Sequence, residues 1–378
     1  MDINRIKAVG FGVQYPMGDF KKVDFSRRSP GDTDIVIDIM YAGICHSDIH
    51  VARGEWGKWH DRQVIPGHEI VGIVKEVGKK VTKFKIGDIA GIGCMVGSCG
   101  ECPNCKSGYE QYCSRGTILT YDSIDWKHNK EITRGGYSTV YVVDQDFAIK
   151  VPKAAAKDLE KVPSLCCAGI TTYSPISKAN VNGKVCAVIG FGGLGHMAVK
   201  YLKSFGAKEI CAFDKVDKSD AAKQLGVEFL LTTKKNLDAY QQKFDFIIST
   251  VPFDYDAEDF LKMVKKEGEF AIVGLPEFSA KKTNLNIADL VLNFGNIKIY
   301  GSQIGGIPET QECIDYSIAH KIYPDVEIID PEAKQIDDAY KNVREGKVRF
   351  RYVIDMTKLN RTEAFHIGGN INYFKFFN

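Results

Sequence analysis

Hydrophobic and polar positions follow two different patterns along the chain. From about residue 5 to residue 150, short apolar runs alternate with turns that contain glycine, as at Asp34–Tyr41, Ile70–Val77 and Ile86–Ile92. Short apolar runs bounded by turn residues are typical of β-strands. This half of the chain therefore predicts a mainly β domain with irregular loops.

After Pro163, apolar runs alternate with stretches of helical periodicity. The expected strands are Val185–Ile189, Glu209–Phe213, Phe229–Leu231, Phe244–Val251, Glu269–Val273 and Ile297–Gly305. The expected helices include Leu194–Phe205, a stretch that ends at Leu225, and Ala257–Lys266. Strands that alternate with helices predict a doubly wound parallel sheet. The last apolar run, Phe350–Met356, is again typical of a strand.

A glycine-rich segment joins the first of these strands to the first helix. The segment Gly190-Phe191-Gly192-Gly193-Leu194-Gly195 matches the pattern Gly-x-Gly-x-x-Gly. Glycines in this pattern allow a tight turn and let the backbone approach a pyrophosphate at the helix N-terminus. Glycine-rich turns also close ordinary strand–helix joints, but the position between strand and helix favours a dinucleotide cofactor.

An acidic residue follows at the position that selects between the two nicotinamide cofactors. Asp214 ends the second strand, about 20 residues after Gly195. A carboxylate there accepts hydrogen bonds from the adenosine ribose and repels a 2′-phosphate, which favours NAD over NADP. The alternative is a turn or helix-capping aspartate. Lys215 and Lys218 follow closely and can bind a phosphate, so the sequence leaves NADP open.

Four cysteines form the pattern Cys-x2-Cys-x2-Cys-x7-Cys in a loop rich in Gly, Pro and Asn. They are Cys99, Cys102, Cys105 and Cys113. Four thiolates can close a tetrahedral Zn²⁺ site that leaves no position for a substrate. An iron–sulfur cluster and disulfides are the alternatives. The pattern therefore predicts a structural metal site rather than a catalytic one.

Composition limits the compartment and the partners. The 378 residues carry 50 Lys and Arg against 48 Asp and Glu, so no strong field favours nucleic acid or an anionic membrane. No apolar run reaches the roughly 18 residues of a membrane span, and Met1–Gly18 lacks a signal-peptide pattern. The 11 cysteines favour metal ligation and free thiols in a reducing cytoplasm. We therefore expect a cytoplasmic protein that binds neither nucleic acid nor membranes.

Two further groups of ligand-type residues are Cys45-His46-Ser47-Asp48-Ile49-His50 and Gly67-His68-Glu69. Their spacing does not show whether they meet in space. The run Gly67-His68-Glu69-x2-Gly72-x5-Gly78-x2-Val81 resembles the pattern of the zinc-containing alcohol dehydrogenases of the medium-chain family. The four-cysteine loop and Gly190–Gly195 resemble the same family. Cys45–His50 and Cys167–Pro175 are most similar to its cinnamyl alcohol dehydrogenase branch, and the whole resemblance covers roughly residues 5–357.

This resemblance implies a GroES-like catalytic domain with a Rossmann domain inserted between its two chain segments. The implied boundaries are 1–157 and 303–357 for the GroES-like domain and 158–302 for the Rossmann dinucleotide-binding domain. The family usually ends earlier than this chain, so the resemblance leaves residues 358–378 as a C-terminal tail of unknown role. The implied assembly is a homodimer.

The resemblance also implies a catalytic Zn²⁺ held by Cys45, His68 and Cys167, in addition to the structural ion. Glu69 is similar to a carboxylate that can occupy the fourth position, and Asp48 to the acceptor that orients the imidazole of His68. Cys166 lies beside Cys167 and is the alternative ligand, but the run Cys-Ala-Gly favours Cys167.

The remaining family residues concern the cofactor and the proton. By resemblance, His46 contacts the cofactor pyrophosphate and Thr171 lies beside the nicotinamide. Ser47 and His50 would carry the alcohol proton to solvent through the cofactor ribose; otherwise they are a turn hydroxyl and a surface histidine. One departure concerns Asp214, because the cinnamyl-type enzymes mostly use NADPH and carry small hydroxyl residues there.

The chain is thus identified as a member of this family. The resemblance implies a zinc-dependent enzyme that transfers hydride between NAD(P)(H) and a primary alcohol/aldehyde pair, aromatic or medium-sized. A polyol-type zinc dehydrogenase is the alternative among enzymes, and a non-catalytic redox sensor that binds zinc and nucleotide is the alternative outside them. About two zinc ions per chain would favour the enzyme, and one would favour the sensor.

Overall fold

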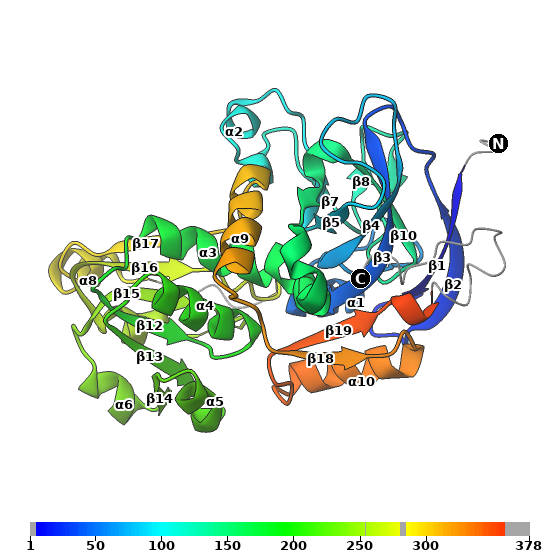
Figure 1. Cartoon of the computed structure of the whole chain (residues 1–378). Coiled ribbons are helices and arrows are strands. Elements are labelled where there is room, and N and C mark those ends of the chain that lie inside the picture. Colours follow the sequence, from blue (N-terminus) through cyan, green and yellow to red (C-terminus); the bar gives the residue numbers. More distant parts are fainter. Residues whose placement is uncertain (1–4, 254, 280–284, 360–378) are drawn as a thin grey trace. The chain divides into compact units, whose positions relative to one another are not determined.

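The computed structural model describes residues 5–253, 255–279 and 285–359. The predicted C-terminal tail therefore lies outside the described residues from position 360 onwards. The chain forms two compact units, one of residues 1–167 and 305–378 and one of residues 168–304 (Figure 1). The assignment of the first unit to catalysis and of the second to cofactor binding stays a prediction.

The first unit holds most of the strands of the chain. Its strands are β1 (Ile6–Gly12), β2 (Lys21–Arg27), β3 (Asp34–Ile44), β4 (Ile70–Val77), β5 (Ile89–Ile92), β6 (Met95–Gly97), β7 (Ile118–Leu119), β8 (Ile124–Asp125), β9 (Glu131–Ile132), β10 (Val140–Asp144), β11 (Ile149–Lys150), β18 (Val326–Ile329) and β19 (Arg351–Asp355). Its α-helices are α1 (His46–Ala52), α2 (Pro103–Lys106), α9 (Ile307–Ala319) and α10 (Ala333–Arg344). Its 3-10 helices are η1 (Glu110–Tyr112), η2 (Gln145–Phe147), η3 (Lys153–Lys161) and η4 (Pro163–Cys166).

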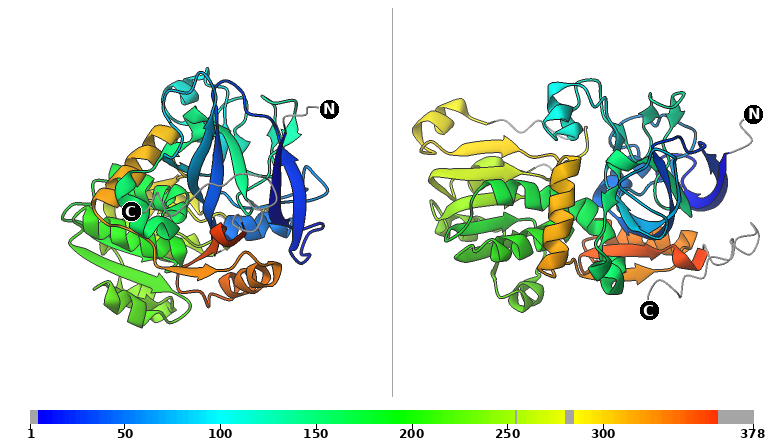
Figure 2. Two further views of the ribbon diagram at one scale, coloured as in Figure 1. Left: turned by 45° about the vertical axis from the view of Figure 1, so that its right-hand side comes forward. Right: turned by 45° about the horizontal axis from the view of Figure 1, so that its top comes forward.

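A seven-stranded sheet forms the centre of the first unit. Its order is β11-β5-β4-β3-β19-β18, and β10 also pairs with β3. Strand β3 is buried along nearly its whole length, which explains its almost continuous apolar sequence. Near the other end of the chain, β19 pairs antiparallel with β3, and Tyr352 lies opposite Ile44. Figure 2 shows these orange and red C-terminal elements beside the blue strands of the same unit.

The second unit is a parallel sheet with helices between its strands. Its strands are β12 (Val185–Ile189), β13 (Glu209–Asp214), β14 (Glu228–Leu231), β15 (Phe244–Ser249), β16 (Val264–Ile272) and β17 (Lys298–Gly301). Its helices are α3 (Ala168–Lys178), α4 (Gly193–Ser204), α5 (Ser219–Gln224), α6 (Lys234–Ala239), α7 (Ala257–Leu261) and α8 (Ile287–Leu292).

The strand order of this sheet confirms the predicted Rossmann fold. The order is β14-β13-β12-β15-β16-β17, and every neighbouring pair is parallel. Counted along the chain, this is the order 3-2-1-4-5-6. The chain reverses direction across the sheet between β12 and β15. Ligands of such sheets bind at the carboxyl ends of the strands at this reversal.

One predicted helix is shorter than the sequence suggested. Helix α7 ends at Leu261 and β16 begins at Val264, whereas a helix was expected to continue to Lys266. Met263 and Val264 are buried in the apolar core of the sheet, and Val264 pairs with Phe244 of β15. Burial of these side chains outweighs the local helix propensity.

Two further observations concern the whole described chain. All 11 cysteines are free thiols. Among residues 5–253, 255–279 and 285–359, no helix combines the length and the apolar character needed to cross a membrane.

Candidate active site

The first unit brings four of the predicted ligand residues into one buried cluster. Donor atoms of Cys45, His68, Glu69 and Cys167 all lie within 4.8 Å of one another. Cys45 follows β3, His68 and Glu69 immediately precede β4, and Cys167 follows η4. The sulfurs of Cys45 and Cys167 are 3.9 Å apart, and His68 Nε2 lies 3.2 Å from the sulfur of Cys167. Two thiols and an imidazole placed in this way fit the donor set of a catalytic Zn²⁺.

The structure separates the two adjacent cysteines that the sequence left as alternatives. Cys167 belongs to the cluster, whereas the sulfur of Cys166 lies 3.0 Å from the place that a Cβ would take on Gly91. The carbonyl oxygen of Cys166 lies 2.7 Å from the corresponding place on Gly93. Cys166 therefore packs against β5 and the residue that follows it, and it is not one of the clustered donors.

Asp48 holds the imidazole of His68. Its fully buried carboxylate accepts four hydrogen bonds. Oδ1 accepts from His68 Nδ1 at 2.9 Å and from the Gly67 amide at 3.1 Å. Oδ2 accepts from the Cys45 amide at 2.9 Å and from the Tyr137 hydroxyl at 3.1 Å. With Nδ1 as the donor to Asp48, His68 presents Nε2 to the cluster in the form that binds a metal.

Charges in the cluster shift the acidity of its members. Burial is the largest single influence and lowers the pKa of His68. The Asp48 carboxylate and the Cys94 and Cys45 thiols together outweigh burial, and the net shift of the pKa is well upward. The hydrogen bond with Cys167 lowers the pKa of the Cys45 thiol well below its ordinary value, and the same contact raises the pKa of Cys167.

Glu69 has a partner that the sequence did not predict. One carboxylate oxygen, Oε1, forms a buried ion pair with the guanidinium of Arg351, the first residue of β19. The other oxygen, Oε2, has no hydrogen-bond partner among the described residues. Burial raises the pKa of Glu69, and Arg351 opposes this shift. The two residues are 282 positions apart, so only the pairing of β19 with β3 brings them together.

Helix α1 carries the residues predicted to contact the cofactor and the proton. The Ser47 hydroxyl lies 3.7 Å from the sulfur of Cys45. His46 is partly buried, and burial, followed by the charge of His50, lowers the pKa of His46 to about 4. These residues share a helix with Asp48, so the carboxylate that orients His68 also fixes the start of this helix through the Cys45 amide.

His50 has a carboxylate partner that the sequence also did not predict. Its Nδ1 lies 2.7 Å from Glu55 Oε2, and its ring stacks on Trp56 with 5.0 Å between the ring centres. Arg53 donates from Nε to Glu55 Oε1 at 2.6 Å. The Nε2 atom of His50 makes no hydrogen bond within the described residues. No helix was predicted over this segment, so the position of Glu55 five residues after His50 carried no sequence signal for this contact.

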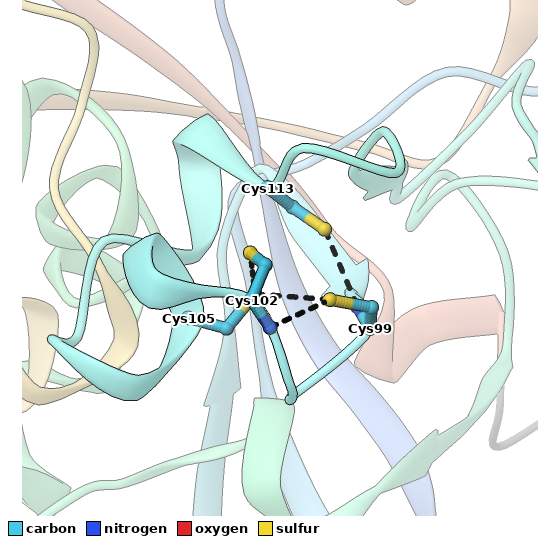
Figure 3. A group of neighbouring side chains, drawn as sticks. All are labelled: Cys99, Cys102, Cys105 and Cys113. Atoms are coloured by element: carbon cyan, nitrogen blue, oxygen red, sulfur yellow. Dashed lines mark hydrogen bonds between the residues drawn. The ribbon is translucent and has the colours of Figure 1, made fainter.

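The four-cysteine loop closes into a second cluster (Figure 3). Donor atoms of Cys99, Cys102, Cys105 and Cys113 lie within 4.8 Å of one another. The sulfurs of Cys102 and Cys105 are 3.4 Å apart, and the Cys102 amide donates to the Cys99 sulfur at 3.3 Å. Backbone amides, first that of Ser114, lower the pKa of Cys102 to about 5. Four thiols with amide donors around them fit a tetrahedral Zn²⁺.

The second unit places the glycine-rich segment at the reversal point of its sheet. Gly190 follows β12 with φ at +87°, and helix α4 begins at Gly193. A Cβ on Gly195 would overlap the carbonyl oxygen of Gly190, so the first turn of α4 packs directly on the loop. Among the described residues, nothing lies within 4 Å of the place that a Cβ would take on Gly192, which leaves room for a ligand beside the loop. Leu194 lies in the first turn of α4.

Asp214 is bound to this loop and to a lysine. Its Oδ2 accepts from the Phe191 amide at 2.8 Å and from Lys218 Nζ at 3.1 Å. Lys218 also donates to the carbonyl oxygen of Phe191 at 3.0 Å. Lys215 is exposed, and Thr171 is buried on α3 of the same unit. The carboxylate therefore carries a neutralising charge beside it, which the sequence pattern alone did not specify.

Comparisons with known proteins agree on the family. Residues 31–153 match the family model of the alcohol dehydrogenase GroES-like domain. Residues 193–318 match the model of the zinc-binding dehydrogenases.

Individual relatives cover nearly the whole chain. The NADP-dependent alcohol dehydrogenase C 1 of Mycolicibacterium smegmatis is 42% identical over 89% of this chain and 95% of its own length. Among solved structures, CAD from Helicobacter pylori complexed with NADP(H) is 47% identical, covers 94% of this chain and 99% of its own, and has a TM-score of 0.86. A cinnamyl alcohol dehydrogenase from Sorghum bicolor is 34% identical over 93% of this chain and 98% of its own, also with a TM-score of 0.86.

Proposed function

Because the chain belongs to the zinc-binding alcohol dehydrogenases, we propose that Cys45, His68 and Cys167 hold the metal at which it interconverts a primary alcohol and an aldehyde. The observation that carries this proposal is the buried cluster of two thiols, one imidazole and one carboxylate. When bound, the metal supplies Lewis acidity to the carbonyl, and the nicotinamide supplies or accepts the hydride.

The chain's own residues hold the groups and move the proton. Asp48 keeps His68 in the tautomer that presents Nε2. Glu69, paired with Arg351 through one oxygen only, can turn its second oxygen toward the cluster when no substrate is there. When Glu69 is not a ligand, its ion pair with Arg351 stabilises the carboxylate away from the metal. The pair thus allows Glu69 to serve as an exchangeable fourth ligand.

The proton leaves along α1. Ser47 lies beside the cluster, and His50 lies on the same helix, with its Nδ1 on Glu55. A proton passed from Ser47 through the cofactor ribose to His50 Nε2 allows Nδ1 to release a proton to Glu55, which is partly exposed. We propose that Glu55 is the outer end of this relay.

Cofactor choice depends on the pair formed by Asp214 and Lys218. The carboxylate favours the ribose of NAD(H), and Lys218 reduces its repulsion of a 2′-phosphate. We propose that the enzyme uses NAD(H) and also accepts NADP(H), the cofactor bound in the Helicobacter pylori structure. In the second unit, we propose that Thr171, Lys215 and the segment Gly190–Gly195 contact the cofactor. His46 of the first unit is proposed to contact it as well.

The proposed substrates are aromatic, cinnamyl-type or medium-sized aldehydes and their alcohols. The similarity to the Sorghum bicolor cinnamyl alcohol dehydrogenase supports the aromatic class. The proposed substrate class is tested by incubating the enzyme with benzaldehyde-like, cinnamaldehyde-like and aliphatic aldehydes. The oxidation of NADH or NADPH is measured by absorbance. A preference for a polyol over all of these would contradict it.

We further propose two zinc ions per chain, the second in the four-cysteine cluster.

We also propose a cytoplasmic location. The eleven free thiols support it, because free thiols persist in a reducing compartment.

A homodimer is supported by apolar side chains on the second unit. Phe278, Ile287, Val291 and Leu292 are 68%, 75%, 75% and 78% exposed, and β17 is an edge strand of the sheet. Light scattering of Leu292→Glu beside the wild type tests this assembly: a wild type that is already a monomer contradicts it.

The two adjacent cysteines allow a matched test of the catalytic metal. Cys167→Ser is expected to retain one zinc ion of two and to lose aldehyde reduction. Cys166→Ser removes a buried thiol of the same segment and is expected to keep both ions and the activity. Loss of metal and activity from Cys166→Ser alone would contradict the proposed ligand set.

A further inference from the structure

The four-cysteine loop is joined to helix α9 by a side chain that neither metal site requires. Glu110 lies between Cys105 and Cys113, as the first residue of η1. Its Oε2 accepts a hydrogen bond from the amide of Ile307, the first residue of α9, at 2.9 Å. Figures 1 and 2 show the cyan loop at this end of the orange helix. The first amide of α9 therefore finds its acceptor on the loop.

The helix has no cap of its own at this end. Its N-cap residue is Gly306, which has no side chain to accept a hydrogen bond, and Pro308 has no amide hydrogen. A Cβ on Gly306 would overlap the carbonyl oxygen of Gly108 in the loop, so the two segments are in direct contact. A carboxylate at a helix N-terminus is also favoured by the helix dipole.

The loop holds Glu110 through the segment that carries its cysteines. The carbonyl oxygen of Glu110 accepts from the Cys113 amide at 3.1 Å and from the Thr117 hydroxyl at 2.8 Å. The backbone of Glu110 is thus set by the same turn that brings Cys113 to the cluster. A metal bound by the four cysteines would fix this turn.

At its other side, α9 supports the segment that ends at Cys167. Helix α9 contacts η4, and Cys313 and Ile314 on its inner face are completely buried. Leu165 and Cys166 of η4 are also buried, and the Cys167 amide bonds to the carbonyl oxygen of Ser164. Cys166 of η4 also lies close to Gly91 and Gly93, because a Cβ on either glycine would meet it at 3.0 Å or less.

A second contact links α9 to the central sheet. Gln311 donates to the carbonyl oxygen of Lys150 and accepts from its amide, both at 2.8 Å. Lys150 lies in β11, which pairs with β5, and β5 pairs with β4 directly after Glu69. Three segments supply donors to the catalytic cluster, and helix α9 is linked to two of them: the segment of Cys167 directly, and that of His68 and Glu69 through β11 and β5.

We propose that Glu110 is a positioning residue: it holds α9 to the four-cysteine loop, so that the metal of this loop helps Cys167 to retain the catalytic metal. This inference rests on the two proposed zinc sites. It predicts that the two metals are not released independently.

Metal release from the two-zinc protein into a chromophoric chelator tests the coupling. Glu110→Ala removes the acceptor of the Ile307 amide, and release of the catalytic zinc is expected to become about tenfold faster, the lower end of the range for residues that support a ligand. Glu110→Gln keeps an acceptor oxygen and is expected to fall between Glu110→Ala and the wild type. Glu101→Ala is the matched control, because Glu101 lies in the same loop and its exposed side chain pairs with exposed Arg115. This variant is expected to match the wild type.

Cobalt(II) substitution identifies which site has changed. A site with two thiolates and one with four differ in the intensity of their sulfur-to-cobalt absorption, so each can be followed separately. A changed spectrum of the two-thiolate site in Glu110→Ala supports the positioning role. Faster release from the four-cysteine site alone overturns the positioning role. So does a fall in thermal stability that leaves the two-thiolate spectrum unchanged. A wild type that holds no catalytic metal would instead contradict the proposed function.

Discussion

Replacement of Asp48 by asparagine tests most directly how the cluster is organised. The wild-type carboxylate accepts from His68 and Gly67 through Oδ1 and from Cys45 and Tyr137 through Oδ2. Asparagine has one acceptor oxygen and one amide group that can only donate. If its oxygen faces His68, its amide group faces the Cys45 amide, and two donors oppose each other.

The expected loss can be worked out from these four bonds. The Tyr137 hydroxyl can rotate and accept from the new amide group, but the Cys45 amide cannot, so one buried donor is left unsatisfied at a cost of about 1–3 kcal/mol. The bond to His68 also loses its charge, which removes roughly another 1 kcal/mol. We expect Asp48→Asn to lower the free energy of unfolding by about 2–4 kcal/mol and the affinity for catalytic zinc by about 10–100-fold.

Urea denaturation of the zinc-loaded protein and competition with a chelator measure the two quantities. Tyr137→Phe is the graded control, because it removes one donor and leaves the other three bonds to Asp48 in place. It is expected to cost about 1 kcal/mol and to change zinc affinity little. An Asp48→Asn protein that binds zinc within twofold of the wild type would refute the reasoning.

Three further predictions concern other parts of the molecule. His50→Gln is expected to lower kcat by about 100-fold, because the relay loses its proton carrier; a steady-state rate equal to that of the wild type would exclude the relay. Asp214→Ser is expected to tighten NADPH binding about tenfold and to weaken NADH binding, as followed by nicotinamide fluorescence; equal shifts for both cofactors would contradict the proposed selectivity. Burial raises the pKa of Asp34, but Arg28, helped by the Gly31 amide and His128, outweighs burial and lowers it. The charged Asp34 therefore stabilises the fold above about pH 4, and this stability is lost as the pH falls. The difference in free energy of unfolding between the wild type and Asp34→Asn should therefore shrink below pH 4, and a constant difference would show that the charge is unimportant.

Local patterns in the sequence were sufficient for the fold class and for the four-cysteine loop. The doubly wound sheet follows from strands and helices that alternate within about 15 residues of one another, and its strand order confirms that prediction. The four cysteines lie within one loop, so their sequence spacing already limits how far apart their sulfurs can be. The assignment of this loop to a structural zinc stays a prediction.

Segment boundaries were less predictable, because burial competes with local propensity. The segment Lys262–Lys266 was predicted to continue the helix, but Val264 pairs with Phe244 in the sheet. Only the packed core shows which preference prevails.

The sequence by itself determined which donor types the chain offers: thiols, imidazoles and carboxylates in a recognisable order. Only the tertiary structure decided which of them meet. It places Cys167 rather than its neighbour Cys166 in the cluster, pairs Glu69 with Arg351, and joins His50 to Glu55. The physical reason is that these contacts depend on strand pairing and side-chain direction, and strand pairing joins residues such as Glu69 and Arg351 whose separation along the chain carries no signal.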